Sequence, residues 1–248
     1  MWNVRIVLVE PAGALNLGSV ARVMKNMGLS QLWLVNPHCD RYSEEATNMA
    51  VHGQEILINA QIVEILPQAL GDCQKVIGTA GRIDAGELAL ISPDLGLSWL
   101  VEHEKFTSAI VFGTEDRGLS NAELQYCQKV INIPTDPAYS SLNLAQAVAI
   151  CCYHLQLLWQ KQSDQTSDRP SSQSAPDSLL TATESIEGFY QHLETLLLDI
   201  GYLYPHTSFS RMQKLRHLFN KAELTETEVT MLRGILRQMQ WKSSAQSD

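Results

Sequence analysis

Short apolar runs alternate with stretches of helical spacing over the first 160 residues of the chain. β-Branched and other apolar residues dominate the runs at residues 6–9, 32–35, 76–77, 109–112 and 130–133. Runs of this length bounded by turn residues are typical of buried strands, and strands that alternate with helices form parallel sheets. The pattern therefore predicts an α/β domain over residues 1–160 with a largely parallel sheet. Within it, Ser120-x-x-Glu123 has the form of a capping box and is expected to open a helix.

A polar segment follows this predicted domain. Residues 161–178 contain no large apolar residue and are rich in Ser, Gln, Asp and Pro. A segment of this composition cannot bury enough apolar surface to offset the entropy cost of ordering it, so we interpret it as a linker.

The residues beyond the linker, 179–248, form a predicted helical C-terminal extension. Apolar residues recur there at helical spacing in three stretches, 186–200, 209–219 and 229–239. Thr181-x-x-Glu184 and Thr225-x-x-Glu228 have the form of capping boxes for the first and third helices. Gly201 is the expected end of the first helix.

Charge is unevenly distributed along the chain. The formal net charge is −9, which argues against a protein that coats nucleic acid non-specifically, because phosphate binding depends on Lys and Arg. Residues 1–160 hold nine Lys and Arg against sixteen Asp and Glu, whereas residues 201–242 hold seven basic and three acidic residues. A basic surface for nucleic acid is therefore expected near the C-terminus.

Several residue patterns argue against other protein classes. The uncharged run 137–160 is long enough for a bilayer but contains Ser, Asn, Gln and His, so we expect a buried core helix and no membrane span. The first residues run directly into a strand without the features of a secretory signal, and the five cysteines form no C-x-x-C pair. Both observations favour a cytoplasmic location. The seven histidines have no metal-ligand spacing, so no metal site is expected.

The turn after the first predicted strand carries the spacing Gly13-x4-Gly18. A phosphate-binding P-loop needs a Lys after the second glycine, and this chain has Ser19 there. The G-x-G-x-x-G pattern of dinucleotide-binding folds is also missing after that strand. We therefore expect neither an NTPase nor a Rossmann-type cofactor site.

Three further turns follow later strands, at residues 78–82, 112–120 and 133–145. Ligands in open parallel sheets bind where the carboxyl ends of strands meet, so these turns could form one pocket. The alternative is that each glycine in them serves only the backbone geometry of its own turn.

Three segments together resemble the signature motifs of the SpoU (TrmH-like) branch of the SPOUT methyltransferases. They are Asn16-Leu17-Gly18-Ser19-Val20-Ala21-Arg22, Phe112-Gly113-x-Glu115-x-x-Gly118-Leu119, and Ile133-Pro134 with Ser141-Leu142-Asn143. Their order, spacing and placement after strands match the family. The helical extension behind a polar linker further resembles the TrmJ subfamily, tRNA (cytidine/uridine-2′-O)-methyltransferases that modify nucleotide 32 at the edge of the anticodon loop.

The resemblance implies a SPOUT fold in which the chain threads a trefoil knot, an exception to the rule that chains do not thread their own loops. It implies a homodimer that binds tRNA at the subunit interface, S-adenosyl-L-methionine (SAM) as the cofactor, and neither a metal nor a membrane. The cofactor contacts that it implies are Thr79, Ala80, Gly81, Gly113, Ile133, Ser141, Leu142 and Asn143.

The resemblance also implies that Arg22, Asn16 and Ser141 take part in catalysis. A guanidinium is effectively always protonated, so we expect Arg22 to hold a phosphate or the 2′-oxygen and not to act as a simple general base. Asn16 could orient Arg22 or the turn itself. Ser141 could bind the cofactor, cap the following helix, or do both. Glu115 could pin backbone amides or contact the substrate.

Basic side chains in both parts of the chain are candidate RNA contacts. The candidates are Arg82, Arg117, Arg211, Lys214 and Arg216. For the last three, a solvated helix face is the alternative. Two other functions fit the same residues: an rRNA 2′-O-methyltransferase of the same branch, and a SPOUT protein that binds RNA without chemistry.

Overall fold

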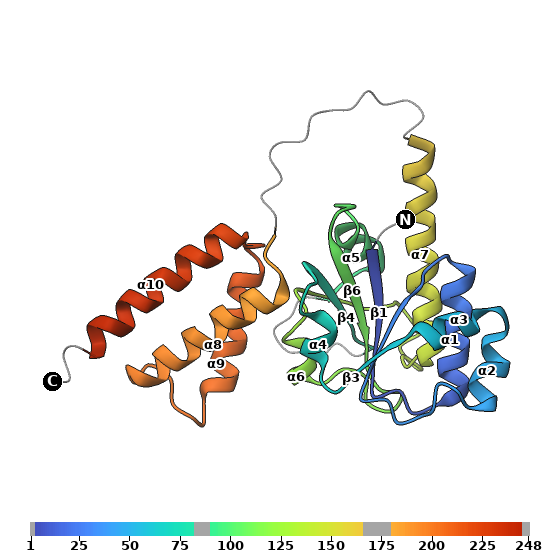
Figure 1. Cartoon of the computed structure of the whole chain (residues 1–248), viewed down its shortest axis with the longest axis horizontal. Helices are drawn as coiled ribbons and strands as arrows, with labels where there is room; N and C mark the ends of the chain where they lie inside the picture. Colours follow the sequence, from blue (N-terminus) through green and yellow to red (C-terminus); the bar gives the residue numbers. More distant parts are fainter. Residues whose placement is uncertain (1–2, 82–89, 166–179, 245–248) are drawn as a thin grey trace. The chain divides into compact units, whose positions relative to one another are not determined.

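A computed structural model describes residues 3–81, 90–165 and 180–244 of the chain. The chain forms two compact units, Met1–Gln173 and Ser174–Asp248. The first unit contains a sheet with helices on both faces, and the second contains only helices in its described part (Figure 1).

The sheet of the first unit has seven strands in the order β3-β2-β1-β6-β4-β7-β5, and every neighbouring pair is parallel. β1 lies between β2 and β6 and pairs with both over nearly its whole length. This confirms the predicted α/β fold with a parallel sheet. The strands are β1 (Asn3–Val9), β2 (Gln31–Val35), β3 (Gln61–Val63), β4 (Lys75–Thr79), β5 (Leu90–Ile91), β6 (Thr107–Phe112) and β7 (Lys129–Ile131).

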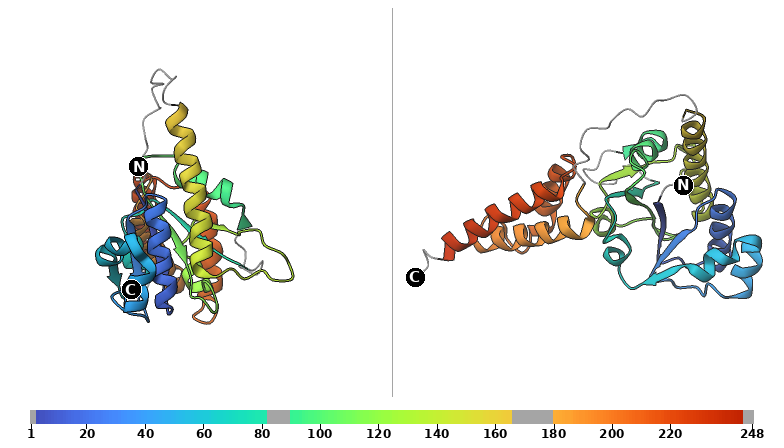
Figure 2. Two further views of the ribbon diagram at one scale, coloured as in Figure 1. Left: turned by 90° about the vertical axis from the view of Figure 1, so that its right-hand side faces the viewer. Right: turned by 45° about the horizontal axis from the view of Figure 1, so that its top comes forward.

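Successive residues of the central strands point to opposite faces of the sheet, and both faces are buried. Ile6 and Leu8 belong to one core cluster and Val7 and Val9 to the other. The larger cluster packs against α1, α3, α5 and α7, and Figure 2 shows α1 and α7 side by side. The helices of this unit are α1 (Ala14–Asn26), α2 (Glu44–Ala50), α3 (Gln54–Asn59), α4 (Leu66–Leu70), α5 (Pro93–Leu100), α6 (Asn121–Leu124) and α7 (Leu144–Gln165), with a 3-10 turn, η1 (Val51–Gly53), before α3.

α7 is the helix expected from the uncharged run. It buries Val148, Cys151, Cys152 and Leu155 in the larger core cluster, as a core helix should. None of the described helices is both long enough and apolar enough to cross a membrane. α7 continues to Gln165, so the helix extends past residue 161, where we had expected the linker to begin.

Two edge strands were not predicted from the sequence. β3 and β5 span only three and two residues, and the residues of β3 are largely exposed. Each strand contains two adjacent apolar residues, Ile62-Val63 and Leu90-Ile91, and neither pair was identified as a strand from the sequence.

The second unit contains three helices in its described part, α8 (Thr183–Asp199), α9 (Ser208–Asn220) and α10 (Glu226–Ser244), as predicted. Their shared core includes Phe189, Tyr190 and Leu196. α8 ends as expected, because Gly201 adopts a φ of 75°, which favours glycine.

Two of the three predicted capping boxes are present. Ser120 and Glu123 bond reciprocally, and Thr225 and Glu228 do the same. The prediction for Thr181 is wrong. The N-cap of α8 is Ala182, and the Thr181 hydroxyl instead donates to Glu226 Oε2 at 2.5 Å. A tertiary contact to α10 thus replaces the local cap.

Candidate active site

The turns that follow β4, β6 and β7 lie together at the carboxyl ends of these strands, because the three strands are neighbours in the sheet. The Thr79 hydroxyl donates to the carbonyl of Val111 at 3.1 Å, which joins the ends of β4 and β6. The amide of Ala80 donates to the carbonyl of Ile131 at 3.0 Å, and Asn132 Nδ2 donates to the carbonyl of Ala80 at 2.8 Å. The turn after β4 is therefore fixed between its two neighbours.

The long loop between β7 and α7 reaches the same turn. A Cβ added to Gly81 would lie 3.7 Å from the carbonyl oxygen of Ser140. In this loop Ile133 and Leu142 are half-buried, whereas Ser141 and Asn143 are exposed. The structure thus brings Gly81 close to Ser140, the residue before Ser141, as the sequence had suggested for these two turns.

Asn143, and not Ser141, caps α7. The Asn143 Oδ1 accepts from the amide of Ala145 at 2.9 Å and from that of Gln146 at 3.4 Å. The Gln146 side chain in turn accepts from the Asn143 amide at 3.3 Å, which completes a reciprocal box. Ser141 lies two residues before this cap and remains exposed. The cap suggested for Ser141 is therefore wrong, and its hydroxyl is available for a ligand.

A chain of side-chain hydrogen bonds joins the three motif segments. Asn143 Nδ2 donates to Asn16 Oδ1 at 2.9 Å, and Asn16 Nδ2 donates to Glu115 Oε1 at 3.2 Å. Because the two bonded pairs are 127 and 99 positions apart in sequence, the contacts fix the relative positions of three separate turns. Asn16 is thus held by Glu115 and Asn143, and no hydrogen bond joins it to Arg22 among the described residues.

Glu115 also holds the start of α1. Its carboxylate accepts from the amides of Gly13 at 3.0 Å and Ala12 at 3.2 Å. Burial alone would raise the pKa of Glu115, but the hydrogen bonds from Gly13 and Asn16 outweigh it, so the pKa lies below its ordinary value. Of the two roles open to Glu115, the structure shows the one in which it pins backbone amides.

Arg22 lies one turn after Gly18 on α1 and is exposed. Gly18 allows α1 to approach α2, because a Cβ there would lie 2.3 Å from the carbonyl oxygen of Ala46. On the next turn of α1, Lys25 pairs with Glu55. Arg22 has no hydrogen bond or ion pair with any other residue in the part of the chain that the structure describes.

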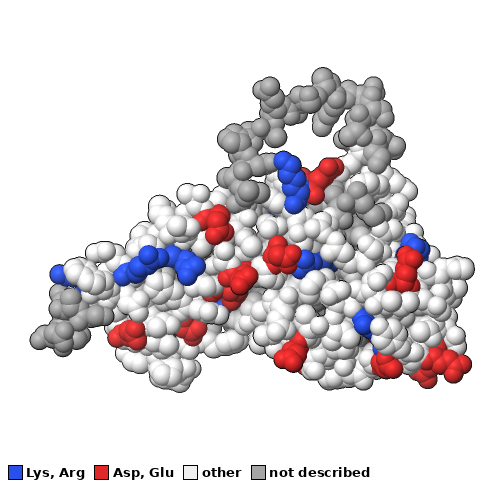
Figure 3. Space-filling view, in the orientation of Figure 1, with Lys and Arg blue, Asp and Glu red and all other residues white. Residues whose placement is uncertain are grey.

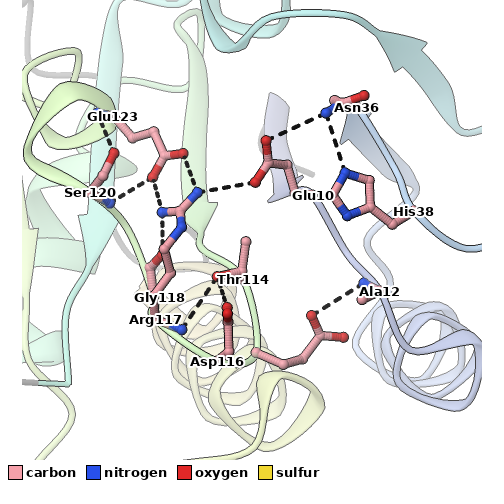
Figure 4. A network of polar contacts seen from close by, with 11 residues as sticks. Glu10, Ala12, Asn36, His38, Thr114, Asp116, Arg117, Gly118, Ser120 and Glu123 are labelled. Carbon is pink, nitrogen blue, oxygen red and sulfur yellow. Dashed lines mark hydrogen bonds and ion pairs between the residues drawn. The ribbon is translucent and has the colours of Figure 1, made fainter.

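Arg117 belongs to a network of ion pairs at the same edge (Figure 4). Its guanidinium donates to both oxygens of Glu123, at 2.8 and 2.9 Å, and to Glu10 Oε2 at 3.1 Å. These bonds raise the pKa of Arg117, most strongly through Glu123. Glu10 itself adopts a φ of 47°, a rare conformation for a residue with a side chain. Arg117 was a candidate RNA contact, and the structure commits it to holding the β6 loop against the end of β1.

The turn after β6 requires glycine at position 113. A Cβ on Gly113 would lie 2.1 Å from the carbonyl carbon of Gly118, so no larger residue fits there. Gly118 closes the turn with a φ of 72° and donates its amide to the carbonyl of Thr114. The loop itself therefore explains the glycine at this position, and the contact of Gly113 with a cofactor stays a prediction.

The comparisons with known proteins agree with this arrangement. Residues 3–153 match the model of the SpoU rRNA Methylase family, which covers β1 through most of α7 and all three motif segments. This chain belongs to the SpoU methylase family. Residues 184–248 also match the family model described as "tRNA methyltransferase TrmJ, C-terminal domain".

Relatives of the whole chain carry the TrmJ name within this SpoU family. The protein from Klebsiella pneumoniae called tRNA (cytidine/uridine-2′-O-)-methyltransferase TrmJ is 40% identical over 237 residues, which covers 95% of this chain and 96% of that protein. The crystal structure of TrmJ from Z. mobilis ZM4 matches with a TM-score of 0.82 and 27% identity, covering 95% of this chain and 98% of that one. A probable methylase family protein from Haemophilus influenzae matches with a TM-score of 0.64 and 33% identity over 99% of both chains.

The candidate RNA contacts differ in their exposure and in the residues that hold them. Arg82 lies outside the described residues. Arg216 is buried in the helical unit, where its guanidinium pairs with Glu187 and lies 4.4 Å from the ring centre of Tyr190. It is therefore not free to bind phosphate, and the predicted role of Arg216 is wrong. Arg211 and Lys214 are exposed, as that role requires.

On the face drawn in Figure 3, basic side chains run along the helical unit with acidic ones beside them. The described residues contain no group of three or more His, Cys, Asp or Glu side chains arranged to hold a metal ion.

Proposed function

We propose that this chain transfers a methyl group from SAM to the ribose 2′-hydroxyl of a cytidine or uridine in tRNA, at nucleotide 32. The observation that carries the proposal is the Glu115–Asn16–Asn143 connection, which holds all three motif segments of the SpoU family in one place. The names of the TrmJ relatives support tRNA as the substrate.

The turns after β4, β6 and β7 form the proposed cofactor site. Half-buried apolar side chains, Ile133 and Leu142, lie next to the exposed polar side chains of Ser141 and Asn143. The apolar side chains and the Ser141 hydroxyl suit an adenosine, which has an apolar face and polar edges, while Asn143 keeps the loop in place by its bonds to Asn16 and Ala145. Thr79, Ala80 and Gly81 complete the site from the neighbouring turn. When bound, SAM supplies the methyl group as an electrophilic sulfonium.

The protein's own contribution is position and charge. Transfer to a hydroxyl needs the ribose in line with the methyl group, and orienting two reactants can supply much of the rate. Arg22 is exposed, charged and without a carboxylate partner among the described residues, so it is available to bind an RNA phosphate or the 2′-oxygen as negative charge develops. Asn16 keeps the turn before α1 in place through its bonds to Glu115 and Asn143.

The proposal includes the quaternary and topological features of the family. The protein would act in the cytoplasm as a homodimer, with the trefoil knot formed by the part of the sheet unit that carries the third motif. The family membership supports these features.

Methyl transfer to defined tRNA transcripts tests the proposal. We expect the purified full-length protein to incorporate label from methyl-labelled SAM into unmodified tRNA, and nucleoside mass spectrometry to detect 2′-O-methylcytidine or 2′-O-methyluridine. A matched transcript with 2′-deoxyribose only at nucleotide 32 should accept no methyl group.

Each contrary result has a separate meaning. Equal incorporation into the deoxy transcript would place the modified nucleotide elsewhere in the tRNA. Label in rRNA fragments but not in tRNA would identify the rRNA alternative, and binding without incorporation would identify a protein that lacks catalysis.

A further inference from the structure

The segment between α8 and α9 exposes an unusual number of aromatic side chains. Tyr202, Tyr204 and Phe209 are 57%, 54% and 51% exposed. His206 and Arg211 are exposed between and beside them. We call these five residues the α8–α9 aromatic surface. Aromatic rings carry large apolar faces, and a cluster of them left in water marks a binding site more often than a lone exposed ring does.

The backbone holds these rings outward in a defined geometry. Leu203 lies between the two tyrosines, is only 1% exposed in the core of the helical unit, and donates its amide to the carbonyl of Leu197 at 2.9 Å. The carbonyl of Tyr204 accepts from the amides of Thr207 and Ser208, at 2.9 and 2.8 Å. Because Leu203 points inward, both tyrosines point away from the core.

Planar cationic or polar groups lie beside the two tyrosine rings. The Arg211 guanidinium lies 5.8 Å from the ring centre of Tyr202 and donates to its carbonyl at 2.8 Å. The ring of His206 lies 5.9 Å from that of Tyr204, with the two planes 24° apart. The surface therefore already contains pairs of planar groups that lie near one another, the arrangement into which a nucleobase can be added.

The charge around the surface favours an anionic partner. The sequence contains no Asp or Glu between Asp199 and Glu223, whereas Arg211, Lys214 and Lys221 lie in this interval. Aromatic rings next to Arg and Lys provide both contacts that single-stranded RNA requires, a stacking face for each base and a positive charge for the phosphate.

We propose that the α8–α9 aromatic surface binds unpaired nucleotides of RNA by stacking them on Tyr202 and Tyr204. The inference rests on the proposed function only in taking RNA as the partner. A base-paired stem offers phosphates but no exposed base faces, so the surface should favour a loop over a stem.

RNA binding by full-length variants tests the inference. The probes are a fluorescein-labelled single-stranded RNA and a blunt RNA duplex of matched composition, measured by fluorescence anisotropy over a range of salt concentrations. The double variant Tyr202→Ala with Tyr204→Ala should bind the single strand at least about fivefold more weakly and the duplex nearly unchanged. The slope of the logarithm of the binding constant against the logarithm of the salt concentration should stay the same, because no phosphate contact is removed. Tyr202→Phe with Tyr204→Phe keeps both ring faces and should bind like the unchanged protein.

The chain offers a matched control in Tyr42. Its ring is 56% exposed and the Arg41 guanidinium lies 4.7 Å from the ring centre, so Tyr42 has an arginine beside it as Tyr202 does. The neighbouring residues are acidic, however, with Asp40, Glu44 and Glu45 close in sequence. Tyr42→Ala should leave binding of both probes unchanged.

Three outcomes would overturn the inference: unchanged single-strand affinity in the double Ala variant, an equal loss on the duplex, or an equal loss in the double Phe variant. A change in oligomeric state with unchanged RNA affinity would assign the surface to a protein contact instead. Melting curves establish that the variants are folded, which the exposure of both rings leads us to expect. Methyl transfer by the unchanged protein is measured in parallel, so failure of the proposed function is seen independently of this result.

Discussion

The sheet unit and the helical unit each contain two kinds of arginine, one held by carboxylates and one without an ion pair among the described residues. In the sheet unit, exposed Arg117 is held by Glu10 and Glu123, whereas Arg22 on α1 is exposed without a partner in the described ranges. In the helical unit, Arg216 is buried against Glu187, whereas Arg211 is exposed beside an aromatic ring. In each of these two pairs, one arginine holds structure and the other is exposed at the surface. Burial and partners distinguish the two kinds, and the residue type does not.

Removal of the buried arginine should have the largest effect. Arg216→Ala leaves the Glu187 carboxylate buried without its counter-charge, so we expect the free energy of unfolding of the helical unit to fall by about 3 kcal/mol. Chemical denaturation followed by circular dichroism measures the change. Arg211→Ala, on the same helix but exposed, should cost no more than about 0.5 kcal/mol. If both variants lost the same free energy of unfolding, the buried and the exposed arginine would not differ in their structural roles.

The exposed arginine of the sheet unit should show the reverse behaviour. Arg22→Ala should lower the single-turnover rate of methyl transfer about 100-fold, equivalent to roughly 2.7 kcal/mol, while SAM affinity and melting temperature stay the same. Arg22→Lys keeps the charge but loses the planar fork and should recover only part of the rate. Lys25→Ala, one turn further along α1, serves as the control. A folded Arg22→Ala protein with a near-normal rate of methyl transfer would show that Arg22 is not catalytic.

Separating the two units should weaken RNA binding by a smaller factor. A chain ending at Gln165, the last residue of α7, keeps the whole sheet unit and should still bind SAM. Loss of the basic helical unit should weaken tRNA binding on the order of tenfold and flatten its salt dependence, because fewer phosphates are neutralised. Filter binding at several salt concentrations measures both. Identical binding by the two proteins at every salt concentration would show that the helical unit does not contact tRNA.

The smallest effect is expected from Glu115 and depends on pH. Burial raises the pKa of Glu115, but the hydrogen bonds from Gly13 and Asn16 outweigh this effect and hold the pKa in the folded protein below its ordinary 4.5. The stabilisation by the ionised carboxylate is therefore complete above about pH 4.5 and is lost as the pH falls through the folded pKa. Glu115→Gln should cost about 1 kcal/mol of unfolding free energy at pH 7 and progressively less as the pH falls below 4.5. A difference that does not change with pH would show that the ionised form makes no special contribution.

The buried centre of the fold was predictable, and its edges were not. β1, β2, β4, β6 and β7 each carry an apolar run that only a buried strand explains, and their order in the chain implies a parallel sheet. β3 and β5 also contain two adjacent apolar residues each, but these strands are short and lie at the two edges of the sheet, where few side chains are enclosed. Strand order likewise depends on long-range pairing that no local pattern contains.

The candidate site was predictable as a set of segments, but the contacts within it were not. That Asn16 would bond to Asn143 and Glu115 depends on how distant turns are placed, and each residue has several possible partners. One error could have been avoided. Arg216 follows Met212 by four residues and precedes Phe219 by three, so helical spacing alone places it on the apolar face of α9. This position predicts a buried ion pair.

The pairing of β1 with β6 bears on the order in which the chain folds. Asn3 lies opposite Thr107, so the central strand pair cannot form until more than a hundred residues have left the ribosome. The helices of the second unit form mainly from contacts close in sequence, and chains with local contacts fold faster. We expect stopped-flow refolding to show an earlier change at Trp241 than at Trp33 in β2, in variants that keep one of these tryptophans at a time. In refolding of the whole chain, the turns that carry Asn16, Glu115 and Asn143 would then take shape only after the helical unit has folded.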